Sequence, residues 1–373
     1  MKRLVVCCDG TWQRLQGDKL TNVALTARAI SPRDRVGNPQ IVYYSPGVGA
    51  SVDGLNVWQG VTGDDLDEHL IGAYLFLTLN YEPGDELYLF GLSRGAYTVR
   101  SLAGLVRKCG ILRRESSDKA RAALELYRHR KIDAESPEAK HFRACYAIAW
   151  PRLEDDGETP EPPMLAEPPV DLRIRYLGVW DTVGALGIPR VLPFSFGDKA
   201  RYEFHDTSLS RAVAFARHAV AIDEKRAAFT PTLWDNVEAF NPPGAAQRVA
   251  QHWFPGDHGG VGGGETARGL SNCALLWMIE GAETAGLAFA RQPGSVLSGA
   301  LAEIDPIEAP IGESGGLPLL DLLGLRWRTG PGDFADLHET ARLRWAANPS
   351  YRPRPLEPYG QEILETLRAT RAA

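Results

Sequence analysis

The stretch Gly91-Leu92-Ser93-Arg94-Gly95 is the most informative part of this chain, because it stands between an apolar run at 87–90 and a helix-patterned segment. A serine flanked by glycines between a strand and a helix is typical of a sharp turn that exposes a hydroxyl at the top of a sheet. The pattern therefore predicts a nucleophilic serine at this position.

The same spacing of glycine and serine occurs again at residues 312–316, around Ser314. With 38 glycines in the chain, a match of this kind needs structural context. No strand pattern precedes the second copy, and Pro306, Pro310 and Pro318 surround it. We interpret it as a turn-rich loop.

Apolar runs and helical patterns alternate along the first 110 residues and resume after about residue 170. This rhythm predicts an α/β fold of the α/β-hydrolase type, with a mostly parallel sheet and helices on both faces. We expect strands at 4–8, 40–44, 86–90, 172–180 and 247–254, and helices at about 64–77, 94–109, 208–221 and 273–285.

Residues 113–170 interrupt the rhythm with a charged helix at 116–130 and an acidic, proline-rich tract at 153–169. A tract of this composition does not form a central strand. We predict a catalytic domain at 1–290 with this insertion, interpreted as a surface loop or a lid, and a C-terminal extension at 291–373 that packs on the same domain.

Composition limits the classes of partner and compartment. The 41 basic and 47 acidic residues give a net charge of −6 without a basic stripe, so no nucleic-acid partner is expected. The five cysteines have no framework spacing and suit a reducing compartment. No signal-peptide pattern or membrane-spanning run is present, which predicts a cytoplasmic protein, with export by a signal-independent secretion system as the alternative.

A serine nucleophile needs a histidine base and a carboxylate that orients this base. Hydrolases of this type carry them in the order serine, acid, histidine, each at the carboxyl end of a strand. Asp181 and His258 follow predicted strands in that order, so we predict the triad Ser93, Asp181 and His258. Asp223 is the rival acid. In the alternative interpretation, Asp181 caps the next turn and His258 is an ordinary loop residue.

The tetrahedral oxyanion needs two donors. The backbone N–H of Arg94 is one, and the amide of Gly10 or Thr11, after the first strand, is the other. A tight turn in which Asp9 binds its own backbone is an equally good interpretation of that loop. The side chain of Arg94 either binds a phosphate or carboxylate of the substrate or forms a structural salt bridge.

No phosphate-binding loop, dinucleotide fingerprint or zinc motif is present, so no cofactor is expected. A metal held by Asp9, Asp257 and His258 rests on residue type alone, and we do not expect a metal either.

In these motifs the chain resembles the α/β-hydrolase catalytic domain of type VI secretion phospholipase effectors, long catalogued as a domain of unknown function. The resemblance implies a serine-dependent lipid or ester hydrolase with Ser93, Asp181 and His258 as its triad. Gly260 and Asn272 stand where the family usually has aspartate, which implies an altered loop beside the base. The matching stretches are 8–12, 21–24, 43–49, 91–97, 178–184, 219–224, 253–258 and 261–264.

The sequence thus predicts a hydrolase that cleaves carboxylic esters, above all lipid or phospholipid acyl esters, through an acyl-enzyme. Its expected partners are the ester or lipid substrate and, transiently, a membrane surface. A soluble small-molecule esterase and a degenerate hydrolase scaffold that acts as a binding module are the alternatives.

Overall fold

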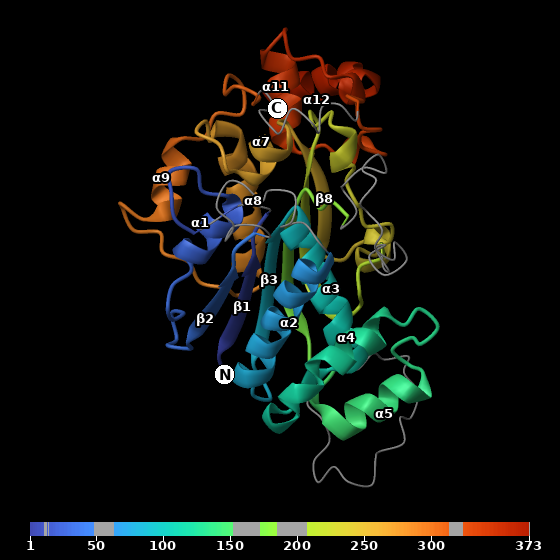
Figure 1. Ribbon diagram of the computed structural model, residues 1–373. Helices are drawn as coiled ribbons and strands as arrows, with labels where there is room; N and C mark the ends of the chain where they lie inside the picture. The colour runs from blue at the N-terminus through green and yellow to red at the C-terminus, as the bar shows by residue number, and fades with distance from the viewer. Residues whose placement is uncertain are drawn as a thin grey trace, which may run out of the picture.

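The computed structural model describes residues 1–10, 13, 15–47, 63–151, 172–184, 207–312 and 324–372. Six strands form one sheet in the order β2-β1-β3-β6-β7-β8, and every neighbouring pair is parallel. This confirms the predicted α/β class (Figure 1). The strands are β1 (Arg3–Cys8), β2 (Gln40–Ser45), β3 (Glu86–Leu92), β6 (Ile174–Trp180), β7 (Val213–Ala221) and β8 (Val249–Phe254).

Helices cover both faces of the sheet because parallel strands bury both of their faces. Along β1, Leu4 and Val6 pack toward α2 and α3, whereas Val5 and Cys7 pack toward α1 and α8. Figure 1 shows these two helical layers. The helices are α1 (Asn22–Ala29), α2 (Gly63–Asn80), α3 (Arg94–Cys109), α4 (Ala120–Arg128), α5 (Pro137–Tyr146), α7 (His258–Gly262), α8 (Gly269–Thr284), α9 (Val296–Ala302), α11 (Glu339–Ala347) and α12 (Gly360–Ala372).

The described part of the insertion lies at the amino end of the strands. It contains α4, α5 and β5 (Ala147–Ala149), which pairs antiparallel with β4 (Ile111–Leu112) just before the insertion. Since α3 starts at the carboxyl edge of the sheet and runs back, the segment that follows it lies at the opposite edge (Figure 1). The acidic tract predicted at 153–169 lies outside the described residues, and so does Ser314.

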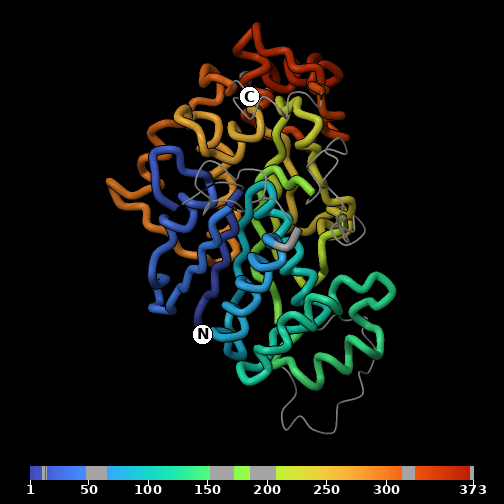
Figure 2. Tube along the Cα trace, in the orientation of Figure 1, coloured from blue at the N-terminus to red at the C-terminus, as the bar shows by residue number. Residues whose placement is uncertain are grey.

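The C-terminal extension packs on β7 and β8. A third apolar cluster joins Val220, Ile222 and Trp253 of the sheet to Leu337 and Trp345 of the extension. The backbone continues this contact, because the N–H of His338 donates to the carbonyl of Trp253 at 3.1 Å. The trace in Figure 2 leads through the extension to the C-terminus, at the end of the sheet opposite the N-terminus.

The helix predicted at 208–221 is wrong, because residues 213–221 form strand β7 between β6 and β8. Alanines and valines at spacings of three and four residues imitate a helical stripe there. A strand buried on both faces shows no alternation that would reveal it, and pairing with two neighbours decides its state. Asp223 therefore follows a strand, not a helix.

His218, on β7, is buried and ties together three parts of the sheet edge. Its Nε2 accepts the N–H of Thr182 at 3.3 Å, and its Nδ1 lies 2.9 Å from Oε1 of Gln251. That oxygen also accepts the N–H of Trp234, so Nδ1 is the donor and the ring is neutral. Burial, with the positive charge of Arg100, lowers the pKa of His218 to about 3.

The turn around the serine depends on two close approaches of backbone. A Cβ on Gly95 would lie 2.1 Å from the carbonyl oxygen of Cys8. A Cβ on Gly91 would lie 2.5 Å from the carbonyl oxygen of Gly95. Glycine at both positions therefore allows the first turn of α3 to contact the end of β1.

We expect Gly95→Ala to lower the free energy of unfolding by at least about 3 kcal/mol, because its methyl group overlaps backbone that cannot move aside. The matched control is Gly299→Ala in α9, where no atom lies within 4 Å of the added Cβ. The control should gain up to about 1 kcal/mol. Urea unfolding measures both variants, and equal effects would contradict the packing argument.

We also expect His218 to make the fold acid-sensitive. Its folded pKa lies below the unfolded value of about 6.5, so the unfolded chain binds more protons and stability falls as pH drops below that value. The slope from this residue reaches about 1.4 kcal/mol per pH unit. Urea unfolding between pH 7 and 4.5 should show a smaller slope in His218→Gln. Exposed His129→Gln is the control, and an unchanged slope in His218→Gln refutes the assignment.

Candidate functional site

Ser93 lies in a strained turn between β3 and α3. Its backbone has φ 57° and ψ −119°, a left-handed conformation that residues other than glycine rarely adopt. Its N–H donates to the carbonyl of Trp180 at 3.0 Å, and its side chain does not cap the helix. This is the strained geometry expected of a nucleophilic serine at a strand-to-helix turn.

Asp181 and His258 form a hydrogen-bonded pair. Nδ1 of His258 lies 2.6 Å from Oδ2 of Asp181. Asp181 follows β6 directly and is fully buried, and His258 is the first residue of α7 after β8. Because the carboxylate only accepts, Nδ1 carries the proton and Nε2 of the neutral ring is left as an acceptor.

Asp181 is held in its charged form. Burial alone would raise its pKa, but the guanidinium of Arg328 and the hydrogen bonds from Arg328 and His258 hold the pKa of Asp181 well below its usual range. Nη1 of Arg328 lies 2.6 Å from Oδ1 of Asp181, and Nη2 lies 2.9 Å from Oδ2. Arg328 lies in the C-terminal extension without a motif around it, so no pattern in the sequence indicated its role.

The structure brings Ser93 and the Asp181–His258 pair to one edge of the sheet. Ser93 binds the carbonyl of the residue before Asp181, and the two follow neighbouring strands. Ser93 Oγ has no hydrogen-bond partner among the described residues, while the His258 ring packs on Phe229 with centroids 4.8 Å apart. Asp181 and His258 are thus hydrogen-bonded, while Ser93 and His258 form no hydrogen bond in this conformation.

Asp223, the rival acid, has other partners. Its Oδ2 accepts the N–H of Gly256 at 2.7 Å and the hydroxyl of Tyr351 at 3.0 Å. Burial raises the pKa of Asp223 to about 6. Asp223 therefore stabilises the turn between β8 and α7 and does not contact His258.

The loop that carries His258 is held by two further carboxylates. Asp257 caps α7 by accepting the N–H of Gly260 at 2.8 Å. The N–H of His258 donates to Oε2 of Glu224 at 3.2 Å, and Arg226 binds the same carboxylate. These bonds fix the backbone of the histidine while its ring faces Asp181.

Neither Gly260 nor Asn272, the positions at which the chain departs from the family pattern, forms a hydrogen bond with Asp181 or His258. A Cβ at Gly260 would lie 3.1 Å from Oδ1 of Asp257, so glycine leaves that cap unobstructed. Asn272 is fully buried, accepts from Arg268 at 3.3 Å and donates to the carbonyl of Ala300 at 3.2 Å. It therefore joins α8 to α9.

Of the two residues predicted to supply the second oxyanion donor, only Gly10 is described; Thr11 lies outside the described residues. A Cβ on Gly10 would lie 3.6 Å from Cβ of Ser93. Its N–H, however, donates to Oδ1 of Asp9 at 2.7 Å, as in the alternative interpretation of a tight turn. Asp9 also accepts from Tyr44 at 2.5 Å, and burial raises its pKa to about 6.

Arg94 begins α3, where backbone N–H groups have no partner within the helix. Burial lowers the pKa of its half-buried side chain to about 10. No ion pair joins this side chain to another described residue, so the structural salt bridge considered for it is not seen in that part of the chain.

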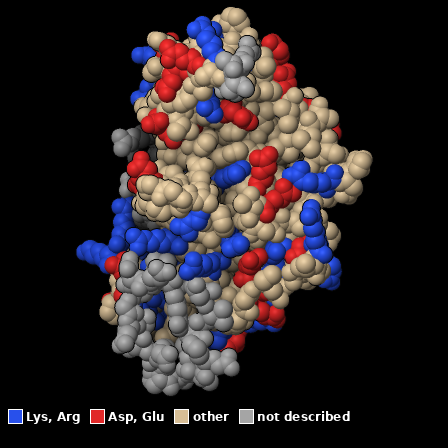
Figure 3. Space-filling view, turned by 180° about the vertical axis from the view of Figure 1, so that it is seen from behind, with Lys and Arg blue, Asp and Glu red and all other residues tan. Residues whose placement is uncertain are grey.

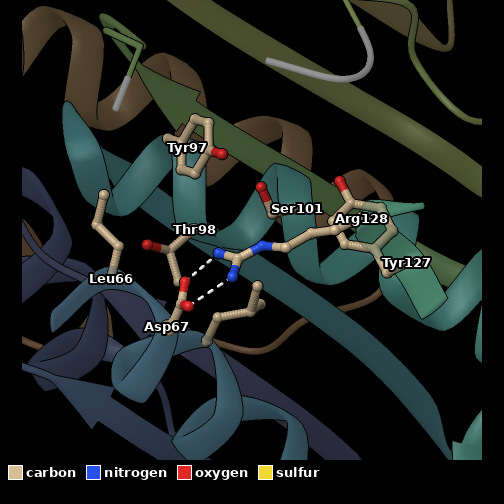
Figure 4. Close-up of a pocket in the computed structure, with 8 residues that line it drawn as sticks. Leu66, Asp67, Tyr97, Thr98, Ser101, Tyr127 and Arg128 are labelled. Carbon is tan, nitrogen blue, oxygen red and sulfur yellow. Dashed lines mark hydrogen bonds and ion pairs between the residues drawn. The ribbon is translucent and has the colours of Figure 1, made fainter. Parts of the chain in front are cut away.

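A small pocket lies between α2, α3 and α4, and the side chains of Asp181 and His258 are not part of its lining. Leu66, Tyr97 and Ser101 contribute to its lining, and Figure 4 shows Asp67 and Arg128 facing each other across it. These two side chains form a two-pronged ion pair between α2 and α4. We interpret the pocket as a packing feature stabilised by that ion pair.

The distribution of charged and apolar side chains among the described residues does not indicate a further kind of ligand. On the face seen in Figure 3, acidic side chains lie among the Lys and Arg side chains. Within the described ranges, no cluster of His, Cys, Asp and Glu side chains is arranged to hold a metal ion. No helix in the same ranges is both long and apolar enough to cross a membrane.

The chain is 28% identical over 242 residues to the uncharacterized protein YEL023C of Saccharomyces cerevisiae, a match that covers 61% of this chain and 32% of the yeast protein. The chain thus spans about a third of that relative.

Two solved structures are also similar. A crystal structure of an uncharacterized protein from Pseudomonas aeruginosa has a TM-score of 0.45 and 19% identity, covering 82% of this chain and 49% of that one. The Tle1 effector bound to the VgrG spike of the type 6 secretion system has a TM-score of 0.36 and 16% identity, covering 70% and 51%.

Residues 2–281 match the family model described as "T6SS, Phospholipase effector Tle1-like, catalytic domain". This match spans the whole sheet, from β1 to β8, and includes Ser93, Asp181 and His258. The chain therefore belongs to the family of Tle1-like phospholipase effector catalytic domains.

Proposed function

We propose that this protein is a serine hydrolase that cleaves carboxylic esters, with lipid or phospholipid acyl esters as its substrates. The observation that carries the proposal is the hydrogen bond of 2.6 Å between His258 and Asp181, beside the strained turn of Ser93. Membership of a phospholipase effector family supports a lipid ester as the substrate.

In the proposed reaction, Ser93 Oγ attacks the carbonyl carbon of the ester while Nε2 of His258 takes its proton. The resulting imidazolium donates that proton to the departing alcohol, which leaves an acyl group on the serine. A water molecule, deprotonated by the same nitrogen, then attacks the acyl carbon, and the C–Oγ bond breaks as His258 returns the proton to Ser93, which releases the acid. Asp181 keeps the proton of the neutral ring on Nδ1 and stabilises the imidazolium in both steps.

The proposed reaction needs a hydrogen bond between the hydroxyl of Ser93 and Nε2 of His258, and the structure has no such bond. Hydrogen bonds of this kind are often long in free enzymes and tighten when substrate binds. The serine turn and the backbone of His258 are both held by hydrogen bonds, so we expect rotation of the two side chains to be enough.

For the oxyanion, we propose the N–H of Arg94 as the first donor, at the positive end of α3. Gly10 and Thr11 remain the candidates for the second. Gly10 lies beside Ser93, but its N–H serves only if it leaves Asp9. The side chain of Arg94 is a candidate for binding an anionic group of the substrate.

Two other functions compete with this proposal. A soluble esterase would prefer dissolved monomeric esters, whereas a lipase-type enzyme would become more active once its substrate aggregates. For a binding module built on a degenerate scaffold, the one supporting observation is that Ser93 and His258 form no hydrogen bond. For the lipase-type enzyme we also propose transient contact with a membrane surface. Its proposed location is the cytoplasm, with export by a signal-independent secretion system as the alternative.

We expect a fluorophosphonate probe to label the wild-type protein on Ser93 and not to label Ser93→Ala, because only an activated serine reacts with it. Hydrolysis of a nitrophenyl ester should fall by at least about 10⁴-fold in this variant. Ser101→Ala, a buried serine two turns further along α3, is the matched control and should be labelled normally. Equal labelling of wild type and Ser93→Ala refutes the nucleophile.

We expect Asp181→Asn to lower kcat by about 10⁴-fold, because an amide no longer holds the ring of His258 in its reactive tautomer. Asp223→Asn should stay within about tenfold of wild type, since asparagine keeps an acceptor for Gly256. Thermal unfolding of both variants, measured alongside, separates loss of fold from loss of rate. If Asp223→Asn alone loses activity, Asp181 is not the catalytic acid.

A further inference from the structure

We propose that Arg328 is a positioning residue of the active site, so that the C-terminal extension completes the catalytic centre. This inference rests on the proposed function, in which Asp181 orients His258. It assigns a role to a residue that lies beyond the stretch matched by the family model.

The contacts of Arg328 define where the Asp181 carboxylate lies. Each carboxylate oxygen faces one guanidinium nitrogen, at 2.6 and 2.9 Å. The same two nitrogens donate to the carbonyls of Ala221 at 2.7 Å and Phe229 at 2.6 Å. The side chain of Arg328 is 5% exposed and that of Asp181 is not exposed at all.

This arrangement settles the plane of the carboxylate. A guanidinium fork matches both oxygens at once, and its own position is fixed by two backbone carbonyls. Oδ1 also accepts the N–H of Ala221 at 3.0 Å. Oδ2 is then the oxygen that points to His258, at the distance of a strong hydrogen bond.

Arg328 also keeps the carboxylate charged. A buried carboxylate with only a neutral imidazole beside it would tend to take up a proton, since the charged form is costly in an apolar interior. Removing one member of a buried ion pair leaves that cost uncompensated. Without Arg328, the pair of Asp181 and His258 would therefore bind a proton more readily, and the base would be lost at a higher pH.

Other charges around the pair do not replace this one. Glu224 and its partner Arg226 hold the backbone of His258, and His218 is neutral and binds the N–H of Thr182. No other cationic side chain of the described residues forms an ion pair with Asp181. The charged or titratable groups that interact with the pair are Arg328, Glu224, Asp257, Glu265 and His218, and Arg226 neutralises Glu224.

The segment that carries Arg328 is anchored independently of Asp181. The N–H of Arg326 donates to the carbonyl of Lys225 at 2.7 Å, and Leu325 pairs with Arg226. The ammonium of Lys225 lies 4.1 Å from the ring centroid of Trp327. The extension is thus held by the loop after β7, and from there the guanidinium of Arg328 contacts Asp181.

The test compares Arg328→Met with Arg328→Lys, and uses Arg344→Met as a matched control. Arg344 lies in the same extension, is also buried, and likewise donates to two carbonyls, those of Pro306 and Ala309, without touching Asp181. The rates kcat and KM are measured for a soluble nitrophenyl ester across the pH range in which each protein stays folded.

We expect Arg328→Met to lower kcat on the order of 10²-fold with little change in KM, because the base is misplaced while substrate binding is not touched. The acidic limb of kcat/KM should move up by at least about one pH unit, since a nearby cation is lost. Arg328→Lys should restore the position of the limb but not the rate. The limb of Arg344→Met should coincide with that of wild type.

A kcat for Arg328→Met within about threefold of wild type overturns the proposal. A lower kcat with no shift in the acidic limb of kcat/KM also overturns it. So does a loss of the same size in Arg344→Met. A second readout needs no turnover: the far-downfield proton resonance of Nδ1 in His258, identified by its absence in His258→Gln and recorded in Ser93→Ala. The pH at which this resonance changes should be higher in Arg328→Met than in the protein with Arg328. If wild type hydrolyses no ester and is not labelled by the fluorophosphonate, the proposed function fails. The resonance then still tests whether Arg328 acts on the Asp181–His258 pair.

Discussion

The carboxylate of Asp181 is fully buried at the carboxyl edge of the sheet, and its neighbours keep it charged. It accepts from the backbone of Ala221 and from His258, and it faces the guanidinium of Arg328. A charge removed from water in this way is stable only when every oxygen is paired. The site therefore depends on contacts from β6, β7, α7 and the C-terminal extension at once.

The turn of Ser93 imposes a second constraint, through backbone and not through charge. Gly91 and Gly95 allow α3 to start against the end of β1, and a Cβ on either would overlap backbone atoms. The strained φ of Ser93 is maintained because the strand before it and the helix after it are both buried. The same close packing brings Gly10, at the end of β1, next to Ser93.

Several features could be predicted from sequence because each has a local cause. Apolar runs followed by turn residues predicted β1, β2, β3, β6 and β8, and the glycines around Ser93 predicted its turn. The order of serine, acid and histidine predicted that Asp181 and His258 would lie near each other, and their hydrogen bond confirms that proximity. The family was also predicted, from motifs in those same turns, and the family match confirms it.

Other features depended on contacts between residues far apart in the chain. Residues 213–221 resemble a helix in their spacing and become a strand because β6 and β8 pair with both of their edges. Sequence alone left Asp223 as a rival to Asp181, and only the directions of their partners in the structure separate the two carboxylates. The amide of Gly10 turned to Asp9, a choice between two hydrogen bonds that no local pattern decides.

Local sequence was enough to predict the class of fold, the turn that carries Ser93 and the edge at which the candidate residues meet, because strand and turn propensities act over a few residues. The tertiary structure alone decided which carboxylate binds His258, and it brought Arg328 from 147 positions away to hold that carboxylate. The physical reason is burial: the preference of a charged group for a partner depends on which atoms surround it once water has been excluded.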